Sequence, residues 1–160
     1  NTVVKWWTLA AEQGYASAQL NLGVIYDDGN GVPQDYQTAV KWYKLAAEQG
    51  YAKAQFNLGM MYDQGKGILQ DYKTAVKWYK LAAEKGNAAA QSNLGTMYAL
   101  GQGVIKDNIY AHMWGNIASS NGNENGGKVR DIVSEEMTPS QLEKAQDFAR
   151  ACVAKDFKGC

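Results

Sequence analysis

Few residues of the chain could do chemistry, and their spacing argues against a catalytic or metal site. His112 is the only histidine, and one histidine with two cysteines cannot complete a zinc site of the usual kind. Asp27 and Asp28 precede a glycine-rich turn, but the further oxygen ligands of a calcium-binding EF-hand loop are not in place. The pair Glu135 and Glu136 has no partner for general acid–base work. We therefore expect no catalytic residue, no metal and no cofactor.

Three Gly-x-Gly elements could in principle cradle a phosphate, but none carries the Lys-Ser/Thr pair of a P-loop. They recur every 36 residues, at 29–31, 65–67 and 101–103. Because glycine tolerates a positive φ, we interpret them as turns that end a helix and reverse the chain. The same period relates four tryptophans, Trp6, Trp42, Trp78 and Trp114. An internal period of this length predicts stacked units that bury their apolar faces against one another.

Each period contains two helical patterns. In the first, here called helix A, small and apolar residues recur at i, i+1, i+4, i+5 and i+8, which is one stripe of an α-helix. In the second, helix B, an acidic residue precedes an apolar run as an N-capping residue does. The predicted capping residues are Asp35, Asp71 and Asp107. Glycine inside helix A is expected to allow close helix contact, at Gly23, Gly59 and Gly95.

The repeated unit closely resembles the Sel1-like repeat family, in its bacterial form. The resemblance rests on Ala-x-Ala-Gln-x-Asn-Leu-Gly-x-x-Tyr, Gly-x-Gly-Val and Asp-Tyr-x-x-Ala-x-x-Trp-Tyr-x-x-Ala-Ala-Glu-x-Gly, between residue 2 and about residue 121. It implies an all-α, right-handed solenoid of antiparallel helix pairs, similar to tetratricopeptide repeats. We expect a leading half-repeat at 1–15, repeats at 16–51, 52–87 and 88–122, and degenerate capping helices at 123–160.

Both ends of the chain depart from the repeat. The start at Asn1 rather than at methionine favours a processed or trimmed chain. Near the other end, Thr138 and Pro139 predict a helix start, with the threonine as cap and the proline at the first helical position. Together with the repeats, these ends predict about nine helices.

The family resemblance implies a non-catalytic adaptor that binds a protein or peptide. The charges of sixteen basic and sixteen acidic residues cancel. The chain therefore has no excess positive charge that would attract nucleic acid. No run of apolar residues is long enough for membrane insertion. The oligomeric state stays open. The alternative function is a hydrolase acting on cell-wall or β-lactam-like compounds, because some related solenoids have been proposed to act on such molecules.

The only two cysteines, Cys152 and Cys160, lie close together near the C-terminus. An even pair at a tail predicts a disulfide that pins the last residues onto the final helix; a buried, free Cys152 is the alternative. The spacing also resembles the Cys-x7-Cys pairs of a secreted, cysteine-rich branch of the family. We therefore expect a periplasmic or secreted bacterial protein.

The side of helix A opposite the constant stripe changes from repeat to repeat, and the resemblance implies that it lines a concave surface. Apolar side chains flanked by amides are typical of an interaction site. The predicted partner-binding residues are Leu20, Asn21, Val24, Lys53, Phe56, Asn57, Met60 and Asn93. Alternatively, these residues pack against the adjacent repeat and the asparagines bond to neighbouring helices.

Two further residue types have structural interpretations. Trp42, Trp78 and Trp114 share the apolar stripe of helix B, so we expect them to be core residues rather than exposed carbohydrate-binding platforms. His112 stands where the earlier repeats have valine, and we expect it to be structural or exposed.

Overall fold

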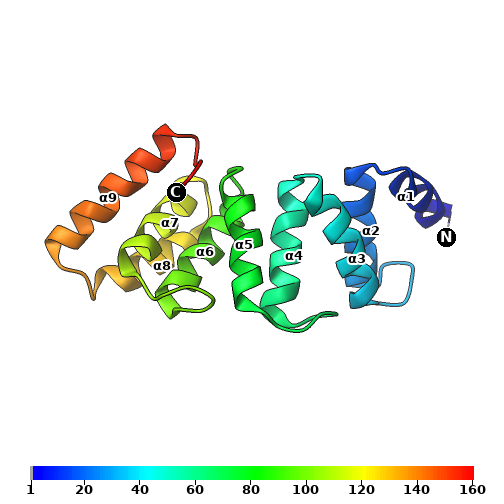
Figure 1. The fold of residues 1–160 in the computed structure, drawn as a ribbon, viewed down its shortest axis with the longest axis horizontal. Coiled ribbons are helices and arrows are strands. Elements are labelled where there is room, and N and C mark those ends of the chain that lie inside the picture. Colours follow the sequence, from blue (N-terminus) through cyan, green and yellow to red (C-terminus); the bar gives the residue numbers. More distant parts are fainter. Residues whose placement is uncertain (1) are drawn as a thin grey trace. The chain divides into compact units, whose positions relative to one another are not determined.

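The computed structural model describes residues 2–160, and these residues form nine helices and no strand. Asn1, on which the prediction of a processed start rests, lies outside them. Figure 1 shows the helices in chain order: α1 (Thr2–Glu12), α2 (Ala16–Asp28), α3 (Tyr36–Glu48), α4 (Ala52–Gln64), α5 (Tyr72–Ala83), α6 (Ala88–Leu100), α7 (Asn108–Ser120), α8 (Glu124–Ser134) and α9 (Pro139–Ala154). The predicted number of helices is confirmed. None of the described helices is long and apolar enough to cross a membrane.

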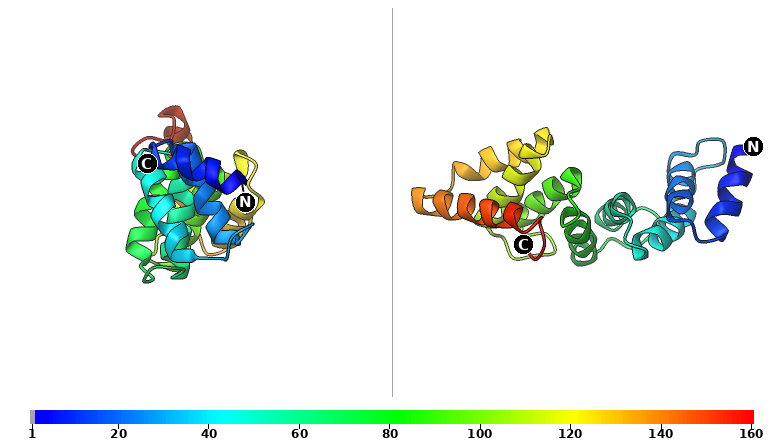
Figure 2. Two further views of the ribbon diagram at one scale, coloured as in Figure 1. Left: turned by 90° about the vertical axis from the view of Figure 1, so that its right-hand side faces the viewer. Right: turned by 90° about the horizontal axis from the view of Figure 1, so that it is seen from above.

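The helices form two compact units, which are described separately. The first ends at Ala75 and the second runs from Val76 to Cys160, so the boundary falls inside α5. In the first unit each helix packs on the next, from α1 through α4. In the second, α6 packs on α7, and α8 and α9 both pack on α7 (Figure 2). Most of these helices thus pack against a helix next to them in the sequence, whereas α9 packs on α7.

Side-chain caps and left-handed glycines set the ends of the helices as predicted. The carboxylates of the predicted capping residues accept backbone N–H groups at the starts of α3, α5 and α7. Thr138 and Gln141 form a reciprocal capping box at the start of α9, with Pro139 directly after the cap. Gly29 ends α2 at a φ of 70°, a conformation that costs glycine little.

A buried glutamine joins each helix A to the helix B before it. The side-chain nitrogen Nε2 of Gln19 donates to the carbonyl oxygen of Ala11 at 3.1 Å. Gln55 and Gln91 make the same bond, eight residues back, to the carbonyls of Ala47 and Ala83. The last carbonyls of a helix have no partner within it. These carbonyls also accept the backbone N–H of Gly14, Gly50 and Gly86 in the following turn, so the glutamine adds a second hydrogen bond that ties the next helix to the same atom.

Gln91 tests how much this bond contributes. Its side chain is fully buried, and its Oε1 also accepts from the Asn121 amide at 2.9 Å. Gln91→Leu keeps the volume but removes both hydrogen bonds; the Ala83 carbonyl still accepts the Gly86 N–H and Asn121 is exposed to solvent, so the free energy of unfolding should fall by about 1–2 kcal/mol. Urea denaturation measures the change. Gln64→Leu, at an exposed position, is the control; equal stability of both variants would refute the role of the bond.

Tyr43 connects three helices of the first unit. Its hydroxyl donates to Oδ2 of Asp27 at 3.0 Å, and the side chain of Asn57, on α4, also interacts with the phenol. Burial raises the pKa of Tyr43 and the charge of Asp27 raises it further, so the phenol stays protonated and remains a donor. The ring lies against Gly23, where a Cβ atom would come within 2.4 Å of two ring carbons. Only glycine fits this contact.

The prediction for the glycines is confirmed at two positions. Besides Gly23, Gly95 lies so close to α7 that a Cβ would be 3.2 Å from the Ala111 carbonyl oxygen. Gly59 is buried, and its role in close packing stays a prediction.

The prediction for the tryptophans is right only in the third repeat. Trp114 is 1% exposed, whereas Trp42 and Trp78 are half-buried and Trp6 is 68% exposed. In the first two repeats the fully buried aromatic is the next residue, Tyr43 or Tyr79. Successive residues of an α-helix point in directions about 100° apart. The tyrosine rather than the tryptophan therefore faces the protein interior.

The contact between Gly23 and Tyr43 predicts an unusual response to alanine. Glycine to alanine inside a helix normally stabilises by about 0.5–1 kcal/mol, but the overlap should make Gly23→Ala destabilising by about 1–3 kcal/mol. In a Tyr43→Leu background the same change should become neutral or stabilising. A double-mutant cycle of urea unfolding measures this, and an identical effect in both backgrounds would show that the ring is not what excludes the methyl group.

Cys152 and Cys160 form the predicted disulfide, with Cα atoms 5.7 Å apart. The chain between them turns back after α9 through Asp156 and Phe157, both at positive φ. The ring of Phe157 reaches the turn between α5 and α6, where a Cβ on Gly86 would lie 3.6 Å from it. The bond thus holds the tail in a conformation that residues other than glycine rarely adopt.

A peptide map tests this pairing. Trypsin cleavage after Arg150, Lys155 and Lys158 should leave the final dipeptide attached to residues 151–155 until a reductant is added. Thiol titration of denatured, unreduced protein should find no free thiol, and two reactive thiols would contradict the bond. Since a disulfide lowers the entropy of the unfolded chain, reduction should lower the free energy of unfolding by up to about 2.5 kcal/mol.

Candidate functional site

The predicted partner-binding residues lie on three helices. Leu20, Asn21 and Val24 are on α2, and Lys53, Phe56, Asn57 and Met60 are on α4, all in the first unit; Asn93 is on α6, in the second unit. Binding of a partner by these residues stays a prediction. Their burial shows which of them a partner could reach.

Two of these residues are less accessible than the sequence suggested. Leu20 is only 6% exposed, because α2 is covered by both α1 and α3. Asn57 is 9% exposed, and its side chain interacts with the Tyr43 phenol. For Asn57 this burial favours the alternative interpretation, a local bond to a neighbouring helix. Neither side chain offers much surface to a partner.

The two sides of α4 differ clearly. Its constant stripe is enclosed, with Ala54 and Leu58 both 0% exposed. On the variable side Lys53 is exposed, and Phe56 and Met60 are half-buried. The spacing of these three residues, i, i+3 and i+7, places them in one row along the helix. This row is here called the α4 ridge.

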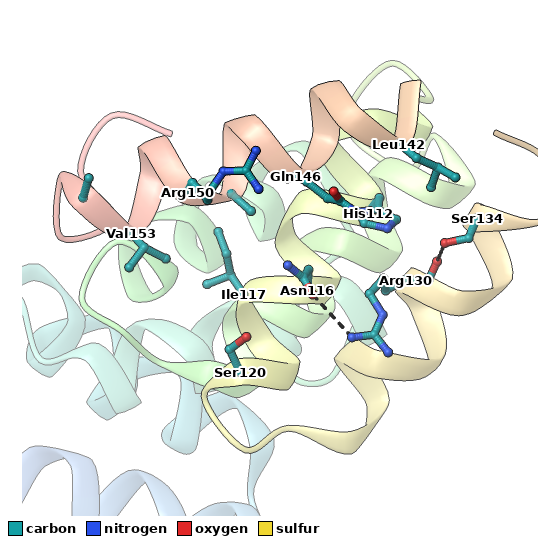
Figure 3. Close-up of a pocket in the computed structure, with 12 residues that line it drawn as sticks. His112, Asn116, Ile117, Ser120, Arg130, Ser134, Leu142, Gln146, Arg150 and Val153 are labelled. Carbon is teal, nitrogen blue, oxygen red and sulfur yellow. Dashed lines mark hydrogen bonds between the residues drawn. The ribbon is translucent and has the colours of Figure 1, made fainter. Parts of the chain in front are cut away.

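A second candidate site, which the sequence did not predict, is a cavity of about 860 Å³ in the second unit. Figure 3 shows side chains of α7, α8 and α9 around it. The side chains that surround it are polar or charged at some positions and aliphatic at others. They are His112, Asn116, Ile117, Ser120, Arg130, Ser134, Leu142, Gln146, Ala149, Arg150, Val153 and Ala154.

Two close helix contacts position the walls of this cavity. Gly115, the counterpart of Tyr43, lies so near α8 that a Cβ would be 2.7 Å from the Gly126 carbonyl oxygen. On the other side, α9 is held against α7 partly by the rings of Tyr110 and Phe148, with centroids 5.8 Å apart. The third repeat thus replaces a large aromatic with glycine, and α8 fills the space.

The cavity is cationic. Arg130 and Arg150 line it, and no acidic side chain does so within residues 2–160. Nη1 of Arg130 donates to Oδ1 of Asn116 at 3.3 Å, the bond drawn in Figure 3. The two arginines pair with Asp131 and Asp147 respectively. These acids offset the charge of the arginines but do not line the cavity, so the charged groups of its wall are guanidinium donors.

His112 is 4% exposed, and its Nδ1 is enclosed without a hydrogen-bond partner among the described residues. His112 is thus buried, as the structural interpretation expects. It also lines a cavity, which the sequence did not predict. Burial lowers the pKa of His112, Arg130 lowers it further, and Asp131 opposes them. The imidazole is thus neutral at pH 7. An unpaired buried polar atom costs about 1–3 kcal/mol.

This arrangement is suited to binding more than to hydrolysis. The Ser134 hydroxyl donates to the Arg130 carbonyl at 2.7 Å rather than to an imidazole. A serine nucleophile needs a base within hydrogen-bond reach. The polar groups of the cavity can instead orient an anion.

The sequence held a signal for this site in its basic residues. Fourteen of the sixteen are lysines, and the only two arginines, Arg130 and Arg150, line the same cavity as the only histidine. The sequence shows that these residue types are rare in the chain. It does not show that three helices bring them together.

Comparison with known families assigns the fold. The sequence model of the Sel1 repeat matches residues 4–15, 16–51, 52–87 and 88–123. The chain belongs to the Sel1 repeat family. Sel1 repeat proteins are generally protein-interaction scaffolds and are typically non-catalytic. No curated protein matched the sequence.

Solved Sel1 structures resemble the whole chain. A protective antigen present in uropathogenic Escherichia coli strains, with this fold, is 38% identical at a TM-score of 0.89; the match covers 96% of this chain and 34% of the antigen. A Sel1 repeat protein from Oxalobacter formigenes is 35% identical at a TM-score of 0.74, over 93% and 63% of the two chains. This chain thus spans less than two thirds of either protein.

A more distant structure shows the fold alone. Cysteine rich protein B of Helicobacter pylori is 20% identical at a TM-score of 0.62, over 80% of this chain and 92% of that protein. The three matches confirm the predicted all-α solenoid fold of this Sel1 repeat chain.

Proposed function

We propose that this protein is a non-catalytic scaffold that binds a protein or peptide on the variable side of its A helices, centred on the α4 ridge. The observation that carries the proposal is the contrast in burial across α4. The stripe that is constant between repeats is enclosed, and the ridge that varies is accessible. Residues that hold the fold are thereby separated from residues free to select a partner.

The chemistry of the ridge fits a polypeptide. Phe56 and Met60 supply apolar contact area, and methionine adapts to differently shaped partners. Lys53 is exposed at the N-terminal end of the row and can pair with an acidic group. Val24 and Asn21 of α2 are half-buried and extend the proposed surface within the first unit. Asn93 of α6 is half-buried at the corresponding position of the second unit. An amide both donates and accepts, as recognition of a peptide backbone requires.

The proposed compartment is the periplasm or the exterior of a bacterium. The disulfide at the C-terminus supports this, because disulfides persist in oxidising compartments and are rare in the cytosol.

Partner capture tests the ridge. The purified chain is used to pull down proteins from a native lysate, and the captured protein is then titrated against variants. Phe56→Ala and Met60→Ala should each weaken its binding by about tenfold, as loss of an apolar anchor does. Lys53→Glu should weaken it without changing the fold, since the side chain is exposed.

Leu69→Ala is the matched control, because Leu69 is an apolar side chain that is 87% exposed outside the helices. It should leave both binding and melting temperature unchanged. If the ridge variants lower the melting temperature strongly while binding persists, the ridge belongs to the core and the partner binds elsewhere.

A further inference from the structure

The cavity of the second unit has features that a scaffold does not require. Its charged lining residues, Arg130 and Arg150, come from two different helices, α8 and α9. His112, on a third helix, presents a ring nitrogen that is enclosed and without a partner in residues 2–160. Buried polar atoms in native proteins are nearly always paired. With its proton on Nδ1, the neutral imidazole has a donor without an acceptor, next to the two arginines that line the same cavity.

We propose that this cavity binds a small organic acid through its carboxylate, with Arg130 and Arg150 as the charged donors and His112 as a neutral one. An arginine has five N–H donors. Nε of Arg130 donates to Asp131 and Nη1 to Asn116, which leaves Nη2 for a ligand. The planar guanidinium matches the two oxygens of a carboxylate.

The rest of the lining favours an organic acid over a free inorganic anion. Ile117, Leu142 and Val153 contribute apolar surface beside the arginines, and an apolar ligand body would be stabilised there. Each arginine is already paired with one aspartate. Because these aspartates offset the charge of the arginines, a singly charged carboxylate is bound there at a lower electrostatic cost than a doubly charged phosphate. A volume of about 860 Å³ is in the range of small-molecule sites.

The test uses the intact chain with its imidazole labelled by ¹⁵N, which gives a single set of ring signals because His112 is the only histidine. The probes are 3-phenylpropionate, its neutral analogue 3-phenylpropanamide, and inorganic phosphate. We expect 3-phenylpropionate to shift the His112 signals saturably. The amide should bind at least about tenfold more weakly, because it lacks the charge that the arginines recognise.

Variants distinguish direct recognition by the two arginines from a general effect of positive charge on binding. Arg150→Gln and Arg130→Gln should each weaken binding of 3-phenylpropionate by about tenfold or more. Lys128→Gln removes a positive charge from α8 outside the lining and should change binding by less than about twofold. Melting temperatures of all variants are compared. If Arg130→Gln does not fold, Arg150→Gln decides, since its side chain is 70% exposed.

Four results would overturn the proposal. Equal binding of the amide would make the cavity an apolar pocket only. A His112 shift with phosphate but not with 3-phenylpropionate would refute the carboxylate assignment. Unchanged binding in Arg150→Gln, or the absence of any saturable shift, would remove the site. Because these measurements do not involve the α4 ridge, their failure leaves the proposed scaffold function untouched.

Discussion

The hydrogen bond from a buried glutamine to the end of the preceding helix is the contact on which the stacking of this chain depends. A short turn brings the start of each helix A under the last carbonyls of helix B, where solvent is excluded. The glutamines at 19, 55 and 91 pair those carbonyls at 3.1–3.2 Å. Each of these carbonyls also accepts the N–H of the turn glycine, so the turn and the following helix are held at the same atom, and this fixes how closely successive helices approach. The small residues beside the glutamines, Ala18, Ala54 and Ala90, are at most 1% exposed.

The elements of this fold were predictable from the sequence, but the residues that fill its core were less so. Caps such as Asp35 and turn glycines such as Gly29 act through backbone groups within a few residues, so local sequence predicts them. The choice between Trp42 and Tyr43 as the buried aromatic depends on the exact direction in which α3 faces α2. Both residues fit an apolar stripe, and only the three-dimensional contact with Gly23 distinguishes them.

The candidate sites were predictable to different degrees for a similar reason. The α4 ridge lies on one helix, so its residues could be grouped from i, i+3 and i+7 spacing. The low exposure of Leu20 could not be predicted from one helix, because it depends on α1 and α3. The cavity is formed by three helices whose approach depends on Gly115 and Gly126. The residue pattern within one helix does not show that three helices meet. In addition, the sequence after residue 122 no longer follows the repeat, so its residues cannot be aligned with the repeats.

The glutamine bond spans only eight residues of sequence, from the end of one helix to the first turn of the next. Each copy of the repeat therefore supplies the donor of one joint, and the first two full copies also supply the acceptor of the next one. A tandem duplication or deletion of one 36-residue segment would create or remove whole joints and would leave none half-formed. Genes of this kind can thus change the number of repeats by simple recombination, and the lengthened or shortened proteins keep properly paired helix ends.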